Sequence, residues 1–267
     1  MILDLHNDYP TAIDISRYDN YIKQCGNADA LAIAVIWTSE FADRAIDKVA
    51  AKFEALVKIK RDLPVAVEDI GFLAEERHLR DFDFSEYIYC SLTWNINNGF
   101  AGGALDDGEL TPLGKRAIRL MNDRGCYLDL AHLNRRSFYQ ALDSAKYALC
   151  SHTGFNDHLR SLNDSQIRAM VERKCVIGLC TVNKFTDAYC ARDFETVIDG
   201  FVQKYGVDCL AIGTDFNGST DIPEDLSDYY KIAALYDGLR ERGYAAQDID
   251  KIFFTNANRI VRREITE

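Results

Sequence analysis

The sequence predicts an α/β protein in which eight parallel strands and their helices form a (β/α)8 barrel, the TIM barrel. Short apolar runs of strand length alternate with longer helix-period segments, and His, Asp or Glu residues follow several of the apolar runs. Strands buried on both faces give continuous apolar runs, and their alternation with helices favours a parallel sheet. The 267 residues also suit a barrel of about 250, so we expect one domain over 1–267.

The predicted strands are rich in Ile, Val, Leu, Tyr and Cys at consecutive positions. They cover residues 2–6, 31–37, 64–68, 88–94, 126–131, 147–152, 175–181 and 208–215. A doubly wound open sheet is the alternative, because it uses the same alternation of strands and helices.

The predicted helices lie between these strands. Apolar residues at helical spacing predict one helix over 41–61. A second helix is expected to begin with Thr111 as N-cap and Pro112 as its first residue, and to end at Gly125. Similar patterns predict helices over 134–146, 163–173, 193–205 and 225–242, and one or two closing helices within 246–264.

Composition and charge exclude several classes of partner. The net charge of −11 argues against binding to nucleic acid, and no stretch approaches the roughly 18 apolar residues of a membrane span. The N-terminal residues do not resemble a signal peptide, and the eight cysteines form no CxxC pair. We therefore expect reduced thiols, a cytoplasmic location and no cysteine-based zinc site.

Residues able to bind metal close several predicted strands. The C-terminal ends of barrel strands converge on one face, where the active sites of this fold lie, so these residues should meet in one pocket. They are His6 and Asp8 at the first strand, Glu68 at the third, His132 at the fifth, His152 at the sixth and Asp215 at the eighth.

The types of these residues predict a site for two metal ions. Imidazole and carboxylate together favour Zn²⁺ or a similar ion, and a carboxylate can bridge two ions about 3.5–4 Å apart. His6 and Asp8, two positions apart on a strand, point the same way and can bind one ion. His132 and His152, from neighbouring strands, can bind the second, with Glu68 between them.

Asp215 is the candidate to transfer protons beside the metals. Each residue taken singly also has a structural reading: Glu68 can cap a helix or form a salt bridge, and Asp215 can cap a loop. The coincidence of three histidines and three acids at one end of different strands favours the site. Asp4 and Asp129 are expected to have structural roles nearby.

Several motifs, in this order, resemble the membrane dipeptidase (renal dipeptidase) family of metallopeptidases. They are Asp4-x-His6-x-Asp8, Val67-Glu68, Asp129-Leu130-Ala131-His132, Ser151-His152 and Gly213-Thr214-Asp215-Phe216-Asn217-Gly218. Supporting matches are Leu110-Thr111-Pro112-Leu113-Gly114, Arg160 ahead of Leu162-Asn163-Asp164, and Asn256-x-x-Arg259.

The resemblance implies an amidohydrolase-type barrel that binds two zinc ions, or other divalent ions, and hydrolyses small dipeptides. It places His6, Asp8 and Glu68 on one ion, and Glu68, His132 and His152 on the other. It also implies that Asp215 delivers a proton to the leaving amine and that Arg160 contacts the substrate near its carboxylate. The implied substrates include dipeptides with a C-terminal D-residue. Members of the family often form dimers, so the resemblance also suggests a homodimer.

The chain departs from the family pattern on the fourth strand, in the eighth-strand motif and in length. Trp94 stands where the family has a histidine that helps to bind the carbonyl oxygen, and an indole donates one hydrogen bond but carries no charge. Asn217 replaces an aspartate, and the chain is shorter than typical members. Trp94 is expected near the substrate, so two alternatives to a dipeptidase stay open. One is an enzyme that hydrolyses another small amide, lactam or ester, and the other is a non-catalytic protein that binds a metal or metabolite.

Overall fold

The computed structural model describes residues 1–12, 28–39, 45–59 and 63–264, and its strands form one parallel sheet. The strand order follows the sequence from β1 to β8. The strands are β1 Ile2–Asn7, β2 Ala30–Trp37, β3 Val65–Glu68, β4 Tyr89–Ser91, β5 Tyr127–Asp129, β6 Ala148–Thr153, β7 Val176–Leu179 and β8 Leu210–Ile212.

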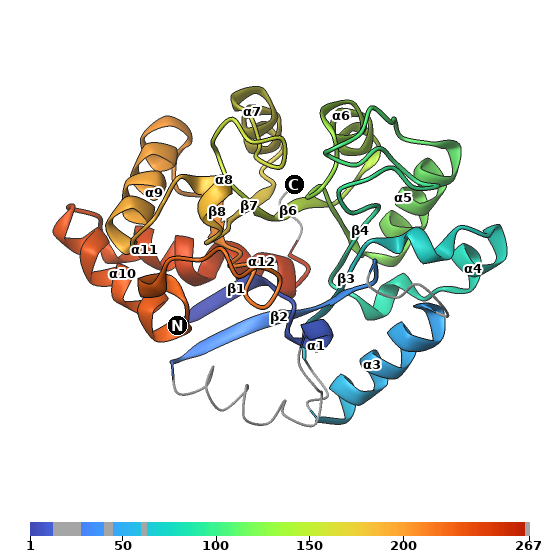
Figure 1. The fold of residues 1–267 in the computed structure, drawn as a ribbon, viewed down its shortest axis with the longest axis horizontal. Coiled ribbons are helices and arrows are strands. Elements are labelled where there is room, and N and C mark those ends of the chain that lie inside the picture. The colour runs from blue at the N-terminus through green and yellow to red at the C-terminus, as the bar shows by residue number, and fades with distance from the viewer. Residues whose placement is uncertain (13–27, 40–44, 60–62, 265–267) are drawn as a thin grey trace.

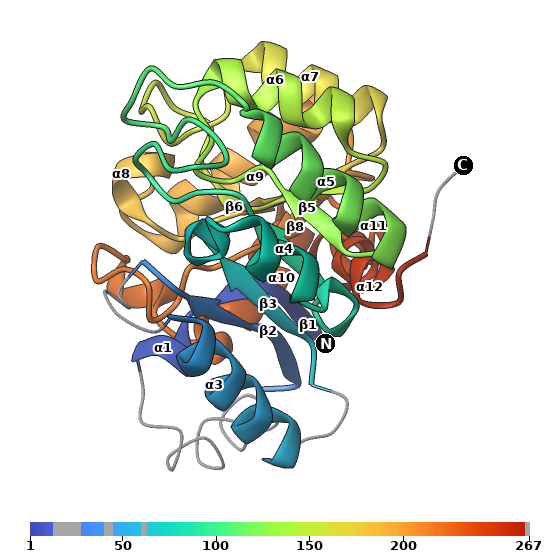
Figure 2. The same cartoon turned by 90° about the vertical axis from the view of Figure 1, so that its right-hand side faces the viewer.

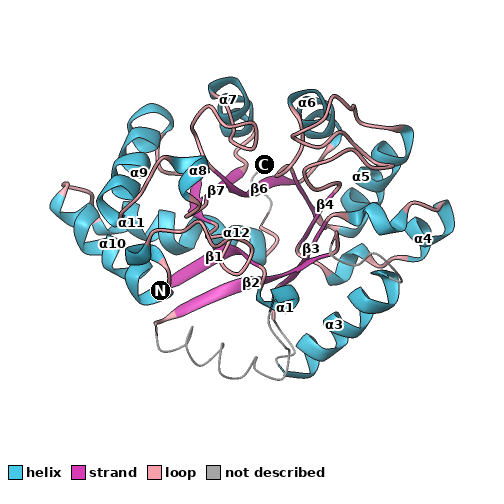
Figure 3. Ribbon diagram, viewed as in Figure 1, coloured by secondary structure: helices cyan, strands magenta, loops and turns pink. Residues whose placement is uncertain are grey.

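The sheet curves into a ring because the chain after β8 returns to β1. The backbone N–H of Asp215 donates to the carbonyl of His6 at 3.1 Å, and that of Asp8 donates to the carbonyl of Phe216 at 2.9 Å. The helices surround the strands (Figures 1 and 3). A doubly wound sheet reverses its strand order, whereas this order is consecutive. The predicted (β/α)8 barrel is confirmed.

Most predicted helices appear close to their predicted positions. The α-helices are α1 Tyr9–Ala12, α3 Ala45–Ile59, α4 Glu76–Asp81, α5 Pro112–Arg124, α6 Arg135–Ser144, α7 Asp164–Glu172, α8 Asn183–Thr186, α9 Ala191–Tyr205, α10 Tyr229–Glu241, α11 Ala246–Asp250 and α12 Asn256–Val261. Short 3₁₀ helices are η2 Ile70–Leu73, η3 Phe84–Glu86 and η4 Glu224–Leu226, and η5 Lys251–Thr255 is a π-helix. Of the predicted helix 41–61, residues 41–44 and 60–61 lie outside the described residues.

Local signals set the helix ends, whereas the strand ends depend on the site. The Thr111 side chain accepts from the backbone N–H of Gly114 at 3.0 Å, and Gly125 ends α5 with a φ of 67°. By contrast, the strands predicted over 88–94 and 208–215 extend only over 89–91 and 210–212. The chain leaves the extended conformation after β8, and Asp215 has a φ of 64°.

The helix α12 covers the N-terminal end of the barrel. Ala257 and Ile260 pack in one apolar cluster with Leu3, Tyr127 and Val176 from three strands. Figure 2 shows α12 at the end of the barrel opposite α1 and α8, which follow β1 and β7. The C-terminal ends of the strands are therefore the end left for a site.

Within the described residues, no helix combines the length and apolar character that crossing a membrane requires. The seven cysteines in this part are free thiols, and all but Cys190 are buried. Cys25 lies outside the described residues.

Candidate metal centre

The structure brings the six predicted site residues together at the C-terminal end of the barrel, and all are buried. His6 lies in β1 with Asp8 just after it, Glu68 ends β3, His152 lies in β6, and His132 and Asp215 follow β5 and β8. Their ligand atoms form groups within 4.8 Å of one another. We call His6, Asp8 and Glu68 the first cluster, and Glu68, His132 and His152 the second cluster.

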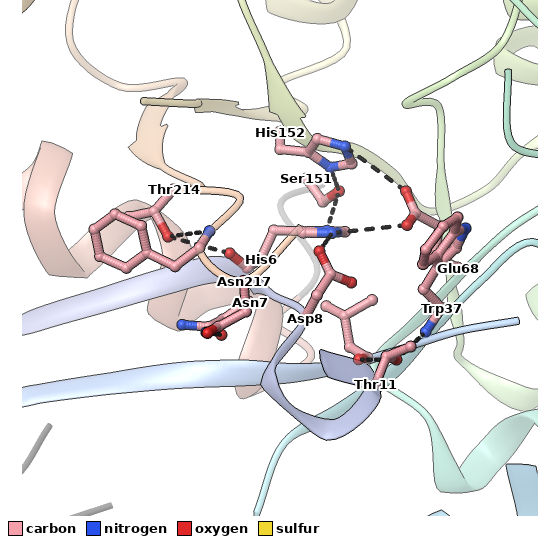
Figure 4. A network of polar contacts seen from close by, with 12 residues as sticks. His6, Asn7, Asp8, Thr11, Trp37, Glu68, Ser151, His152, Thr214 and Asn217 are labelled. Atoms are coloured by element: carbon pink, nitrogen blue, oxygen red, sulfur yellow. Dashed lines mark hydrogen bonds and ion pairs between the residues drawn. The ribbon is translucent and has the colours of Figure 1, made fainter. Parts of the chain in front are cut away.

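Glu68 is shared by both clusters, with one carboxylate oxygen toward each. Its Oε2 lies 4.0 Å from His6 Nε2, which is itself 3.3 Å from Asp8 Oδ2. Its Oε1 lies 2.6 Å from His132 Nε2 and 3.7 Å from His152 Nε2. Figure 4 shows Glu68 facing both His6 and His152.

The first cluster has the properties of a cation site. His6 Nε2 and Asp8 Oδ1 are buried without a hydrogen-bond partner among the described residues, which is costly unless something else binds them. Burial by itself lowers the pKa of His6, but the negative charge of Asp8, aided by that of Glu68, outweighs it and raises that pKa to about 10. The surroundings of His6 therefore favour positive charge, and these residues fit a divalent ion.

The second cluster combines neutral imidazoles with an ionised carboxylate. Burial, together with the charge of Arg160, lowers the pKa of His132 to about 4. Burial and the neighbouring His6 hold the pKa of His152 well below its usual range. Burial opposes ionisation of Glu68, yet His132 and His6 lower its pKa to about 2. Neutral imidazole and carboxylate are the forms that bind zinc.

Asp215 and His132 adopt left-handed backbone conformations that bring their side chains into the site. Their φ angles are 64° and 66°, each of which costs about 1–3 kcal/mol for a residue with a side chain. Burial and the neighbouring Asp8 carboxylate raise the pKa of Asp215 well above its usual range. Asp215 is thus the carboxyl group of the site best suited to hold a proton.

Arg160 lies inside the centre. It is buried, and its Nη2 lies 3.1 Å from His132 Nε2 and 3.0 Å from His152 Nε2. The guanidinium can only donate, so the two imidazole nitrogens accept with their lone pairs. The Nε2 lone pairs of His132 and His152 therefore both point at the Arg160 guanidinium. The predicted contact of Arg160 with a substrate carboxylate stays a prediction.

Trp94 contributes to an aromatic wall beside the second cluster. Its ring centroid lies 5.8 Å from that of His132 and 5.2 Å from that of Trp37. Both indoles line the cavity over the clusters, of about 100 Å³, together with Lys184 and Phe185. A substrate group that enters this cavity would therefore contact the two indoles.

Sequence reasoning missed several residues of the centre. Asn95 and Ser151 bond to imidazoles of the site, and each directly follows or precedes a predicted site residue, so adjacency could have revealed them. Trp37 ends β2 and could have been found as a strand-end residue. No local pattern marks Lys184 in α8, which reaches the cavity only through the fold.

The barrel and its buried cluster of histidines and carboxylates are those of metal-dependent hydrolases. Residues 65–267 match the family model described as membrane dipeptidase, peptidase family M19. The match covers well over half of the chain, and the chain therefore belongs to the membrane dipeptidase family of metallopeptidases.

Three relatives of known sequence resemble this chain, and two of them are named dipeptidases. A protein of Klebsiella pneumoniae, named for its place in the pqqA 5′ region, is 30% identical over 212 residues, which cover 72% of this chain and 78% of that protein. A Schizosaccharomyces pombe protein named an uncharacterized dipeptidase is 30% identical over 199 residues, 68% of this chain. Dipeptidase tcpJ of Claviceps purpurea is 25% identical over 196 residues, 69% of this chain. The chain spans about half the length of these last two, 48% and 46%.

Solved structures share the fold at low identity. Dipeptidase AC, a metallopeptidase of family M19, superposes with a TM-score of 0.83 at 17% identity over 98% of both chains. A metallopeptidase from Rhodobacter sphaeroides, liganded with a phosphinate mimic of the dipeptide L-Ala-D-Ala, gives 0.83 at 16% identity over 98% of both chains. The probable dipeptidase PvdM from Pseudomonas aeruginosa gives 0.76 at 15% identity over 94% of this chain and 89% of that one.

Proposed function

We propose that this chain is a dipeptidase that uses two divalent metal ions, zinc in the first instance, to hydrolyse the peptide bond of small dipeptides. The observation that carries this proposal is the shared position of Glu68 between two clusters of metal-binding side chains. A carboxylate between two sets of ligands is the arrangement found in two-metal hydrolases.

The first cluster would hold one ion and the second cluster the other. Ions bound there would polarise the scissile carbonyl and make water a stronger nucleophile near neutral pH. The buried unpartnered atoms of His6 and Asp8 support this assignment, since a metal ion would satisfy both.

The remaining residues would bind and protonate the substrate. The raised pKa of Asp215 favours the protonated form of its carboxyl, which would give the proton to the leaving amine. Arg160 is the cation in the centre suited to bind the substrate carboxylate, since a guanidinium can form paired hydrogen bonds with it. The Trp94 indole can donate one hydrogen bond toward the carbonyl oxygen.

Substrates with a C-terminal D-residue are part of the proposal. The Rhodobacter sphaeroides metallopeptidase that shares this fold holds a mimic of L-Ala-D-Ala, which makes such dipeptides the first to try. Hydrolysis of another small amide, lactam or ester is the second candidate. Trp94 favours it, because a bulky neutral indole beside His132 changes the shape and charge of the pocket.

A dipeptide panel tests the proposal. Zinc-loaded protein is incubated with matched L,L and L,D dipeptides, and a chelator-treated sample serves as the control. We expect hydrolysis that disappears on chelation and returns with added Zn²⁺. Metal-loaded protein that cleaves no dipeptide but opens a small lactam or ester would favour the second candidate. Hydrolysis of dipeptides by metal-free protein would contradict the metal assignment.

A further inference from the structure

The hydroxyl of Ser151 lies between two imidazoles that belong to different clusters. Its Oγ is 3.1 Å from His6 Nδ1 and 2.8 Å from His152 Nδ1. Figure 4 shows Ser151 between the two rings, with the Nε2 atoms of both rings on the side of Glu68. Ser151 is itself fully buried.

The single proton of this hydroxyl is directed away from both rings. Ser151 Oγ donates to Asp129 Oδ2 at 2.6 Å. The other oxygen of Asp129, Oδ1, accepts from the backbone N–H groups of Ala131 at 3.0 Å and Ser151 at 2.9 Å. Since its own proton is committed to Asp129, the hydroxyl can only accept from the imidazoles.

A second acceptor beside His6 also shows that His6 Nδ1 is the donor of its hydrogen bonds. Tyr89 Oη lies 3.0 Å from His6 Nδ1 and donates its own proton to the carbonyl of Leu5 at 2.8 Å. Both oxygens beside His6 Nδ1 are therefore acceptors, so this nitrogen carries a proton. By the same reasoning His152 carries one on Nδ1, and the Nε2 atom of each ring is the one that faces its cluster.

We infer that Ser151 is a positioning residue shared by the two clusters, fixing the tautomer and orientation of one histidine in each. The inference rests on the proposed metal site. It makes the metal affinities of both clusters depend on one hydroxyl, because hydrogen bonds to the far nitrogen of a histidine ligand orient it and raise its basicity. His132 is outside this control, since Asn95 Oδ1 accepts from its Nδ1 at 2.9 Å.

A second pair of residues, Thr214 and Asp4, has the same hydrogen bonds as Ser151 and Asp129 but, in the described part of the chain, no contact with an imidazole. Thr214 binds Asp4 as Ser151 binds Asp129, with its N–H 2.8 Å from Oδ1 and its Oγ1 2.6 Å from Oδ2. Among the described residues, no imidazole nitrogen bonds to the Thr214 hydroxyl. Thr214→Val therefore removes the same kind of buried hydrogen bond without removing a bond to an imidazole, although Thr214 Oγ1 also contacts the backbone carbonyl of His6 at 3.4 Å.

Metal titration of three variants tests the inference, with zinc affinities read by competition against a chromogenic chelator. Ser151→Ala should weaken zinc binding at both clusters by about 10–100-fold, the usual effect of losing such a partner. Asn95→Ala should weaken only the second cluster, and Thr214→Val should leave both affinities near those of the unaltered protein. Unchanged affinities in Ser151→Ala, or a loss confined to one cluster, would overturn the shared role.

A measurement on the unaltered protein keeps the inference testable if Ser151→Ala fails to fold. In zinc-loaded protein with ¹⁵N-labelled histidine, long-range ¹H–¹⁵N spectra should show His6 and His152 protonated at Nδ1. A bare Nδ1 in either ring would overturn the assignment. Both readouts are independent of turnover. A protein whose zinc affinity depends on Ser151 but which cleaves no dipeptide would therefore refute only the proposed function and leave this inference standing.

Discussion

The two ends of the barrel are both buried but are built from opposite kinds of side chain. At the N-terminal end, Ala257 and Ile260 of α12 pack against apolar residues of the strands. At the C-terminal end, three histidines and three carboxylates are buried together, and some of their polar atoms, including His6 Nε2 and Asp8 Oδ1, have no hydrogen-bond partner among the described residues.

The difference shows where stability and function reside. Burial of apolar surface contributes roughly 25 cal/mol per Å², so the N-terminal end stabilises the fold. Burial of ionisable groups costs free energy unless they are paired or bind a metal. The C-terminal end therefore carries a cost that binding of cations would offset. Changes at the two ends should have separable effects on hydrolysis and on unfolding.

Asp215→Asn should have the largest effect on hydrolysis. The amide keeps the size of the side chain but cannot give up a proton in the way a carboxyl can, so kcat should fall by about 10²–10⁴-fold. Zinc content should stay at the level of the unaltered protein, since every residue of the two clusters is retained and asparagine keeps an oxygen atom near His6 and His152. Steady-state kinetics and elemental analysis check this. Full activity would remove Asp215 from the mechanism.

Gly218→Ala should disturb the site by crowding. A Cβ at this position would lie 2.2 Å from Asp8 Oδ2 and 2.4 Å from Asp215 Oδ1, so both carboxylates or the backbone at residue 218 must shift. Displacement of a reacting group by about 1 Å can cost a hundredfold, and we expect kcat/KM to fall by about that factor.

Gly200→Ala is the matched control for this crowding. A Cβ on Gly200, in α9, meets no atom within 4 Å. Its kcat/KM should be unchanged, and the free energy of unfolding should rise by up to about 1 kcal/mol. Equal loss of activity in both variants would mean that crowding at Asp8 and Asp215 is not the cause.

Metal binding should depend on pH differently at the two clusters. The pKa of His6 is about 10, so below that pH the ring is protonated and must release a proton when an ion binds to the first cluster. Affinity there should rise about tenfold per pH unit between about pH 7 and 9. The pKa of His132 is about 4, so His132 is already neutral and releases no proton in this range.

Calorimetric titration in buffers of different ionisation enthalpy measures these protons. One proton should be released for the ion bound to the first cluster and none from His132. Proton release that is the same for both ions, or absent for both, would contradict the contrast between the clusters.

Ile260→Ala should leave hydrolysis unchanged and affect only the fold. Truncation of a buried isoleucine leaves a cavity under the barrel, at a cost of about 2–5 kcal/mol in the free energy of unfolding. Urea unfolding measures this loss, and kcat/KM at a temperature where the variant is folded measures the site. A large fall in kcat/KM of the folded variant would mean that the two ends are coupled.

The fold and the cluster could be predicted because their signals are local in the sequence. Apolar runs mark the strands, and a ligand residue at the end of a strand is placed by the barrel with little dependence on its neighbours. His6 and Asp215 meet although they are 209 positions apart, because both lie at the same end of the sheet.

The rest of the site depends on contacts that no local pattern records. Ser151 is important because two rings from β1 and β6 reach its hydroxyl, and such a contact exists only in the folded chain. Arg160 was predicted for the substrate, but whether its guanidinium turns toward the imidazoles depends on the packing of the loop before α7. The early end of β8 is likewise accompanied by a backbone turn at Asp215.

The number of zinc ions bound per chain, measured in the unaltered protein and in Glu68→Gln, tests the shared role of Glu68 most directly. Native mass spectrometry with elemental analysis should find two ions on the unaltered protein. In Glu68→Gln both should bind more weakly, because one carboxylate serves both clusters. A single ion on the unaltered protein, or loss of only one ion in the variant, would contradict a centre built around Glu68.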